Sequence, residues 1–240
     1  MQNTANRIWE LDCLRGVAII LMVIFHFFFD LNYFGILQNA MYSGYWLIFQ
    51  RVTLSLFLIT VGVSLHLQRV KNPRQIFSKR FIALLAAAVL ITIATWLYSP
   101  SETIWFGVIH LIALSTLLAI PFLNRAKLCA AIGTVMLAGS LFFTLPQINS
   151  PLLLWLGVQF PGFSSFDYVP LIPWFGLILI GIYLGKKLYP LLASIVPKPQ
   201  NAIINYKINA LQFLGCNSLV IYLIHQPLLF AAIKLWQLVR

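Results

Sequence analysis

The chain has 240 residues, of which 61% are hydrophobic and only 9% are charged. This composition excludes an ordinary soluble domain, in which about 25% of the residues are charged. The formal net charge of +11 at pH 7 would indicate nucleic-acid binding in a soluble protein. Here we expect a polytopic membrane protein that forms a single transmembrane domain over residues 1–240 and binds no nucleic acid.

Seven apolar stretches are long enough to cross a hydrocarbon core of about 30 Å, which takes about 20 helical residues. They are apolar on nearly every side, whereas the strands of a membrane β-barrel alternate polar and apolar residues. The sequence therefore predicts an all-α bundle of about seven transmembrane helices. These helices are expected near residues 14–34, 45–67, 80–98, 103–122, 126–145, 168–186 and 212–235.

The first stretch carries the ionisable residues Arg15, His26 and Asp30. Arg15 and His26 are eleven residues apart, which is three helical turns plus about 20°, and Asp30 follows one turn after His26. Polar groups on a spanning helix face a protein interior or a water-filled cavity. We therefore expect function here, with Asp30 placed to orient the imidazole of His26, although Arg15 could instead reach lipid phosphate at the inner surface.

Ionisable residues on four predicted spans lie at similar depth. With a rise of about 1.5 Å per residue, His26 lies about 12 Å below the outer face of the membrane core. Arg51, His110 and His225 lie about 9 to 10 Å below it by the same estimate. A common layer favours a shared polar site, because structural histidines scattered over the bundle would have little reason to lie at one depth. A lone buried histidine, by contrast, is usually a core residue with its hydrogen bonds satisfied.

The loops between the predicted spans indicate the topology. Positively charged residues concentrate in cytoplasmic loops, and this rule predicts a cytoplasmic N-terminus and an outer C-terminus. The same rule explains the net charge of +11 with no need for binding to nucleic acid. The residues assigned to the cytoplasmic side are Arg7, Arg15, Arg69, Lys71, Arg74, Lys79, Arg80, Arg125, Lys127, Lys186, Lys187, Lys198 and Lys207.

Two connecting segments have unusual compositions. The loop near 67–79 is basic and could attract anionic lipid headgroups or a phosphorylated cofactor. The outer loop near 146–167 is apolar, which is typical of an interfacial or re-entrant lid but equally of a membrane anchor. The three cysteines and four histidines show no metal-ligand spacing, so no metal is expected.

The polar residues are compatible with three kinds of function. In acyl transfer, a neutral His26 would remove a proton from an amine or hydroxyl, and Arg51 or His110 would stabilise the oxyanion. In a non-enzymatic transporter or channel for a polar solute, the histidines would form a proton relay. In the third case the polar residues only lock the bundle or bind a membrane lipid. Spacing alone does not separate these alternatives.

Four motifs carry a resemblance to known families. Residues 7–16, with Leu14-Arg15-Gly16 followed by His26, resemble the opening of the transmembrane acyltransferase superfamily. The segments 105–115, 167–176 and 217–227 resemble bacterial proteins grouped with the heparan-alpha-glucosaminide N-acetyltransferase catalytic domain. The likeness covers most of the chain.

The resemblance implies an acyl-CoA-dependent enzyme of the bacterial inner membrane. It would move an acyl group, for which we expect acetyl, from cytoplasmic acetyl-CoA to a sugar or envelope glycan acceptor. His26 would be the catalytic base or acyl carrier, and Arg15 would lie on the route of the CoA. His110, Asp167, Asn217, His225 and Gln226 match family positions. By charge and sidedness we further expect the CoA phosphates to bind Arg69, Lys71, Arg74, Lys79 and Arg80.

The chain departs from the family pattern in two respects. The lysosomal enzyme carries its catalytic histidine in a His-Ala-x-Trp-Asn-Gly sequence after the first span, and here Asn39 stands in that place. The better-known relatives have ten or more spans where about seven are expected here. The difference leaves room for a partner protein, a homodimer or a smaller mechanism.

Overall fold

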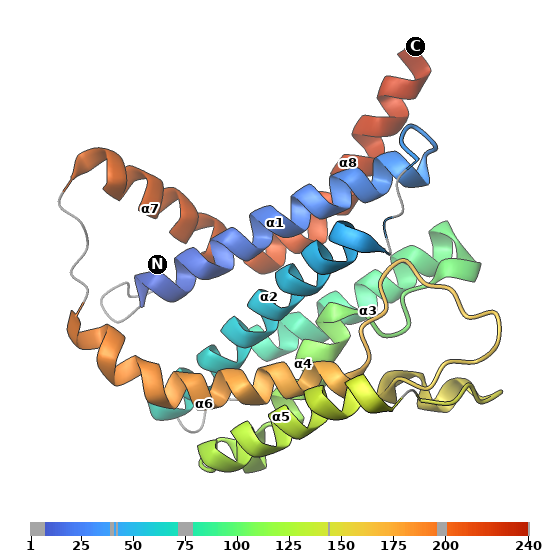
Figure 1. Cartoon of the computed structure of the whole chain (residues 1–240). Coiled ribbons are helices and arrows are strands. Elements are labelled where there is room, and N and C mark those ends of the chain that lie inside the picture. Colours follow the sequence, from blue (N-terminus) through green and yellow to red (C-terminus); the bar gives the residue numbers. More distant parts are fainter. Residues whose placement is uncertain are drawn as a thin grey trace. The chain divides into compact units, whose positions relative to one another are not determined.

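The computed structural model describes residues 8–38, 41, 43–71, 79–143, 145–195 and 201–239. These residues form helices and connecting segments with no β-strand among them, so the predicted all-α class is confirmed (Figure 1). The α-helices are α1 (Trp9–Tyr33), α2 (Gly44–Lys71), α3 (Lys79–Tyr98), α4 (Val108–Leu118), α5 (Ala126–Phe142), α6 (Leu171–Ile195), α7 (Ala202–Cys216) and α8 (Ser218–Val239). Short 3₁₀ helices are η2 (Pro100–Glu102), η3 (Ile120–Phe122) and η4 (Pro151–Leu156).

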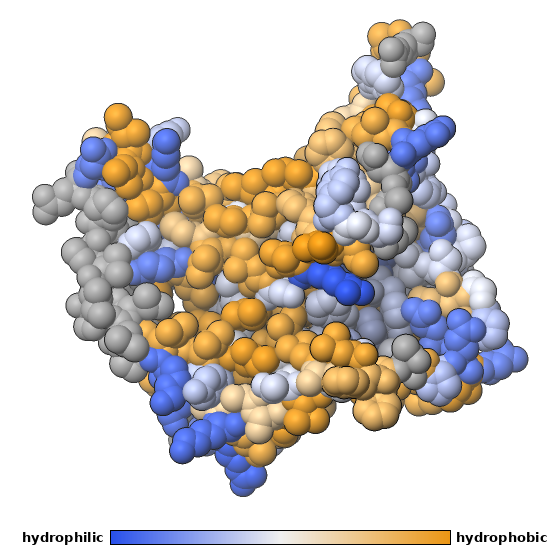
Figure 2. Space-filling view, in the orientation of Figure 1, coloured by the Kyte–Doolittle hydropathy of each residue, from blue (hydrophilic) through white to orange (hydrophobic). Residues whose placement is uncertain are grey.

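Among the described residues, five helices are long and apolar enough to cross a membrane. The five segments are Trp9–Tyr33, Gly44–Val70, Lys79–Tyr98, Leu171–Leu188 and Ser218–Val239. The shorter apolar helices α4 and α5 lie within the predicted fourth and fifth spans. The chain is therefore a multi-pass membrane protein, and hydrophobic residues form broad areas along its helices (Figure 2).

The boundaries of two predicted spans were wrong. The stretch near 103–122 is helical only over Val108–Leu118, because the backbone is extended at Gly107 and Pro121 interrupts the helix within η3. The stretch near 212–235 begins inside α7, and α8 starts only after Asn217. Helix α7 was not predicted, since its first half is too polar for a span; Asn201 caps it by accepting hydrogen bonds from the backbone N–H groups of residues 203 and 204.

The chain divides into two compact units, Met1–Phe57 with Ala193–Arg240, and Leu58–Leu192. In the first unit α1 packs against α7 and α8. Glycine permits this approach, because a Cβ atom on Gly16 or Gly215 would collide with the carbonyl oxygen of Leu211 or of Asp12, respectively. An aromatic core formed around Phe25, Met41 and Trp46 packs at the other end of α1.

In the second unit the loop after α5 is tied to the segment that precedes α4. The backbone N–H of Phe166 donates to the carbonyl of Glu102 (3.1 Å), and that of Val169 donates to Phe106 (3.1 Å). The Tyr168 hydroxyl donates to the carbonyl of Leu154 (2.8 Å), and burial raises the pKa of Tyr168 to about 12. The loop is thus fastened at several points along its length.

Candidate functional site

Two histidines on different helices of the first unit lie in ring contact. His26 on α1 and His225 on α8 have ring centroids 4.9 Å apart, with the planes inclined by 74°. The Nδ1–H of His26 donates to the carbonyl of Met22 (2.9 Å), and that of His225 donates to the carbonyl of Tyr222 (2.7 Å). In a neutral imidazole whose Nδ1 carries the hydrogen, Nε2 holds the free lone pair. Both rings can therefore act as a base through Nε2.

A second polar contact joins the same two helices one turn further along α1. The Nε2–H of Gln226 donates to Oδ1 of Asp30 at 2.7 Å, and Asp30 is 0% exposed. Because Gln226 directly follows His225, both contacts depend on the same packing of α1 against α8. The carboxyl group of Asp30 is bonded to Gln226 and Nδ1 of His26 to Met22, so the imidazole is oriented by the backbone of its own helix.

The structure brings together three of the five residues predicted as catalytic, namely His26, Asp30 and His225. Arg51 belongs to the same unit, on α2, and its side chain is exposed. His110 belongs to the second unit and has partners of its own there. The catalytic role of each of these residues stays a prediction.

His110 uses both ring nitrogens for hydrogen bonds. Nδ1 accepts from the backbone N–H of Gly107 (3.2 Å), so the hydrogen resides on Nε2, which donates to Oγ1 of Thr92 (3.0 Å). The Thr92 hydroxyl in turn donates to the carbonyl of Ile104 (2.8 Å). This chain of bonds joins α3 to the segment that leads into α4, which is a sufficient structural reason for a histidine here.

Asp167 completes the amino-terminal end of α4. Its Oδ2 accepts a hydrogen bond from the backbone N–H of Val108 at 3.0 Å, across 59 residues of sequence. A carboxylate at this position satisfies one of the N–H groups that a helix start leaves without an intrahelical partner. The loop between α5 and α6 is thereby coupled to α4.

We expect Asp167→Ala to lower the thermal unfolding midpoint by about 2 to 8 °C, because losing such a cap costs about 1 to 2 kcal/mol. The measurement is thermal unfolding of the detergent-solubilised protein. Asp167→Asn retains an acceptor oxygen and is expected to lose less than half as much. Equal losses in the two variants would show that the negative charge of Asp167, rather than the hydrogen bond, stabilises the loop.

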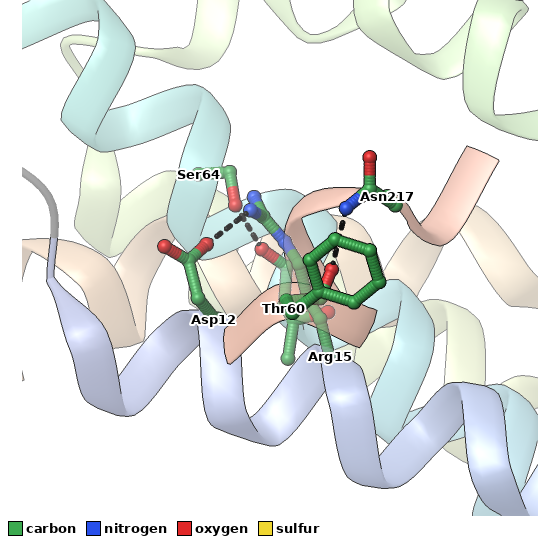
Figure 3. Close-up of polar contacts among 6 residues, drawn as sticks. Asp12, Arg15, Thr60, Ser64 and Asn217 are labelled. Atoms are coloured by element: carbon green, nitrogen blue, oxygen red, sulfur yellow. Dashed lines mark hydrogen bonds and ion pairs between the residues drawn. The ribbon is translucent and has the colours of Figure 1, made fainter. Parts of the chain in front are cut away.

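Arg15, predicted on the CoA route, forms an ion pair with Asp12 one turn earlier on α1 (Figure 3). The guanidinium Nη1 lies 3.0 Å from Oδ1 of Asp12, and the two side chains are only 11% and 7% exposed. Asp12 thus compensates the charge of Arg15, for which lipid phosphate is the alternative partner expected from the sequence.

Asn217, which follows the last residue of α7, donates through Nδ2 to the carbonyl of Phe213 at 2.8 Å.

The basic residues predicted to bind the CoA phosphates lie around the connection between α2 and α3. Arg69 and Lys71 are in the last turn of α2, and Lys79 and Arg80 begin α3 with exposed side chains. Arg74 lies outside the described residues. Binding of phosphate by these residues stays a prediction.

Sequence reasoning missed two partners in the site. Asp12 lies three residues before Arg15, a spacing at which helical side chains of opposite charge meet, and the pair could have been predicted from that alone. Gln226 was noted in a motif, but no role was assigned to it. Its bond to Asp30 spans 196 residues of sequence, and nothing local indicates it.

The comparisons with known proteins agree with the resemblance seen in the motifs. The family model described as heparan-alpha-glucosaminide N-acetyltransferase, catalytic, matches residues 7–227. No curated protein and no solved structure matches the chain. The matched region includes α1 and the part of α8 that carries His225 and Gln226. The chain therefore belongs to the heparan-alpha-glucosaminide N-acetyltransferase catalytic domain family.

Proposed function

We propose that this protein is an acetyltransferase of the bacterial inner membrane, which moves an acetyl group from cytoplasmic acetyl-CoA to a sugar or cell-envelope acceptor. The family match supports acetyl transfer, and the family uses acetyl-CoA. The observation that carries the proposal is the contact of two imidazole rings, His26 and His225, on two helices that are long and apolar enough to span a membrane. The N-terminus would be cytoplasmic and the C-terminus outside.

His26 is the general base of the proposed reaction. As the nitrogen or oxygen of the acceptor attacks the thioester carbonyl, Nε2 of His26 takes the proton from that atom. A bond forms between the acceptor and the acetyl carbon, the carbon–sulfur bond of acetyl-CoA breaks, and the proton passes from His26 to the departing sulfur. The reaction therefore needs no net proton uptake.

His225 assists His26 in this scheme. Its ring lies edge-to-face against that of His26, and its own Nδ1 is engaged with the backbone, so Nε2 is its only site for exchanging a proton. Two imidazolium rings at this distance would repel one another. Beyond its two Nδ1–H groups, the pair therefore takes up at most one additional proton during the reaction, which keeps one Nε2 available as a base for the acceptor.

Acetyl-CoA would reach the site from the cytoplasmic side. Its phosphates would bind the basic residues at the α2–α3 connection, since Lys79 and Arg80 are exposed there. By its match to the family motif, Arg15, which forms an ion pair with Asp12, would lie on the route of the CoA chain. The acceptor would enter from the outer side.

The test measures CoA release by the purified full-length protein. Radiolabelled acetyl-CoA is supplied with amino sugars, such as glucosamine, and with bacterial envelope extracts as acceptors. We expect free CoA and labelled acceptor in equal amounts. The proposal fails if calorimetry detects no binding of acetyl-CoA to the folded protein, or if liposomes containing it show a pH-dependent solute flux that needs no CoA.

A further inference from the structure

Asp30 and Gln226, which share a hydrogen bond, each have a second polar atom that needs explanation. Within the part of the chain that the structure describes, Oδ2 of Asp30 and Oε1 of Gln226 are buried and have no hydrogen-bond partner. Asp30 is 0% exposed, and its other oxygen already accepts from Gln226 at 2.7 Å. Buried polar atoms are nearly always hydrogen-bonded, so this pair needs an explanation.

An ionised carboxylate explains the two atoms poorly. It only accepts hydrogen bonds, so neither its Oδ2 nor the amide oxygen of Gln226 could satisfy the other. A buried charge also requires an opposite charge or several donors, and the bond that the structure shows for this carboxyl group comes from one neutral amide. A carboxylic acid, by contrast, carries one O–H donor.

We propose that Asp30 is a carboxylic acid that forms a two-bond ring with the side-chain amide of Gln226. Nε2–H donates to Oδ1, as observed, and the Oδ2–H of Asp30 donates to Oε1 of Gln226. One proton thus satisfies both orphan atoms. The pair joins α1 to α8 one turn from His26 and directly beside His225, and it acts as a positioning element that sets the distance between the two imidazoles. This function in catalysis rests on the proposed acetyl transfer, whereas the protonation itself does not.

The titratable residues nearest to the pair along its two helices are His26 and Tyr33 on α1, and Tyr222 and His225 on α8. Nδ1 of each histidine is bonded to a backbone carbonyl, of Met22 and of Tyr222 respectively. The observed partner of the Asp30 carboxyl is the amide of Gln226. A ring of one carboxylic acid and one amide therefore accounts for the hydrogen bonding of Asp30 and Gln226 without any charge on either side chain.

The direct test is infrared spectroscopy of the full-length protein at neutral pH, comparing wild type with Asp30→Asn. The wild-type minus variant spectrum should contain the carbonyl band of a protonated carboxylic acid. In Gln226→Leu this band should move to higher frequency, because its carbonyl loses the donated hydrogen bond. Carboxylate bands in place of the acid band would overturn the proposal, whether or not the protein has transferase activity.

Activity provides an independent test of positioning. Asparagine at position 30 offers an N–H where the acid has its O–H, so Asp30→Asn should release CoA at least about threefold faster than Asp30→Leu. Asp30→Leu leaves the amide of Gln226 without partners and should lower the rate by at least about tenfold. If Asp30→Asn loses as much activity as Asp30→Leu while both remain folded, a negative charge is required and the acid–amide pair is wrong.

Discussion

His26→Ala is expected to lower the rate of CoA release by about 10²- to 10⁴-fold, the usual contribution of a general base. The variant loses the imidazole ring on α1 that is in contact with the ring of His225. The affinity for acetyl-CoA should change little, because the basic residues proposed to bind its phosphates lie at the connection between α2 and α3. The measurement is kcat for CoA release, together with calorimetric binding of acetyl-CoA.

The matched control is His66→Gln. His66 is also a buried histidine on a spanning helix, α2, but it is not part of the proposed machinery. We expect the rate of CoA release by His66→Gln to remain close to that of wild type. Added imidazole should partly restore His26→Ala, because a small base can fill the space left by the ring. A full rate in His26→Ala would exclude this residue both as base and as acyl carrier.

The fold class could be predicted because it depends on composition. Long apolar runs must form helices in a membrane, since every backbone polar group needs a partner within the protein. The exact ends could not be predicted where tertiary contacts decide them. Helix α4 starts at Val108 because Asp167, far along the chain, accepts the N–H of Val108. No local pattern around residue 108 contains that information.

The candidate site could be predicted only in part for a similar reason. Helical spacing places Arg15, His26 and Asp30 on one face of α1, and this inference needs no partner. Depth in the membrane, however, says nothing about which way a side chain points around its helix. His26 and His225 have similar estimated depths and are in contact, whereas His110, at a similar estimated depth, is engaged with Thr92 and Gly107 of its own unit.

Gly181→Leu is expected to prevent stable folding of the second unit. Gly181 and Gly185 are four residues apart on α6, the small-residue spacing that lets membrane helices approach closely. A Cβ on Gly181 would lie against the carbonyl oxygen of Ile59 and 3.0 Å from the Cα of Gly62, both on α2. Neither atom can move without displacing the helix. Since the obstacle is backbone, the cost exceeds that of ordinary overpacking, which is about 1 to 3 kcal/mol.

The measurement is the thermal unfolding midpoint of the solubilised protein, for which we expect a fall of at least about 10 °C or a loss of folded material. Gly139→Leu is the control, because Gly139 also lies in an apolar helix, α5, and a Cβ there meets nothing within 4 Å. Leucine is the better helix former, so this variant should be as stable as wild type or slightly more so. If both variants unfold at the wild-type temperature, α2 and α6 do not depend on this contact, and the glycines of α6 must be explained otherwise.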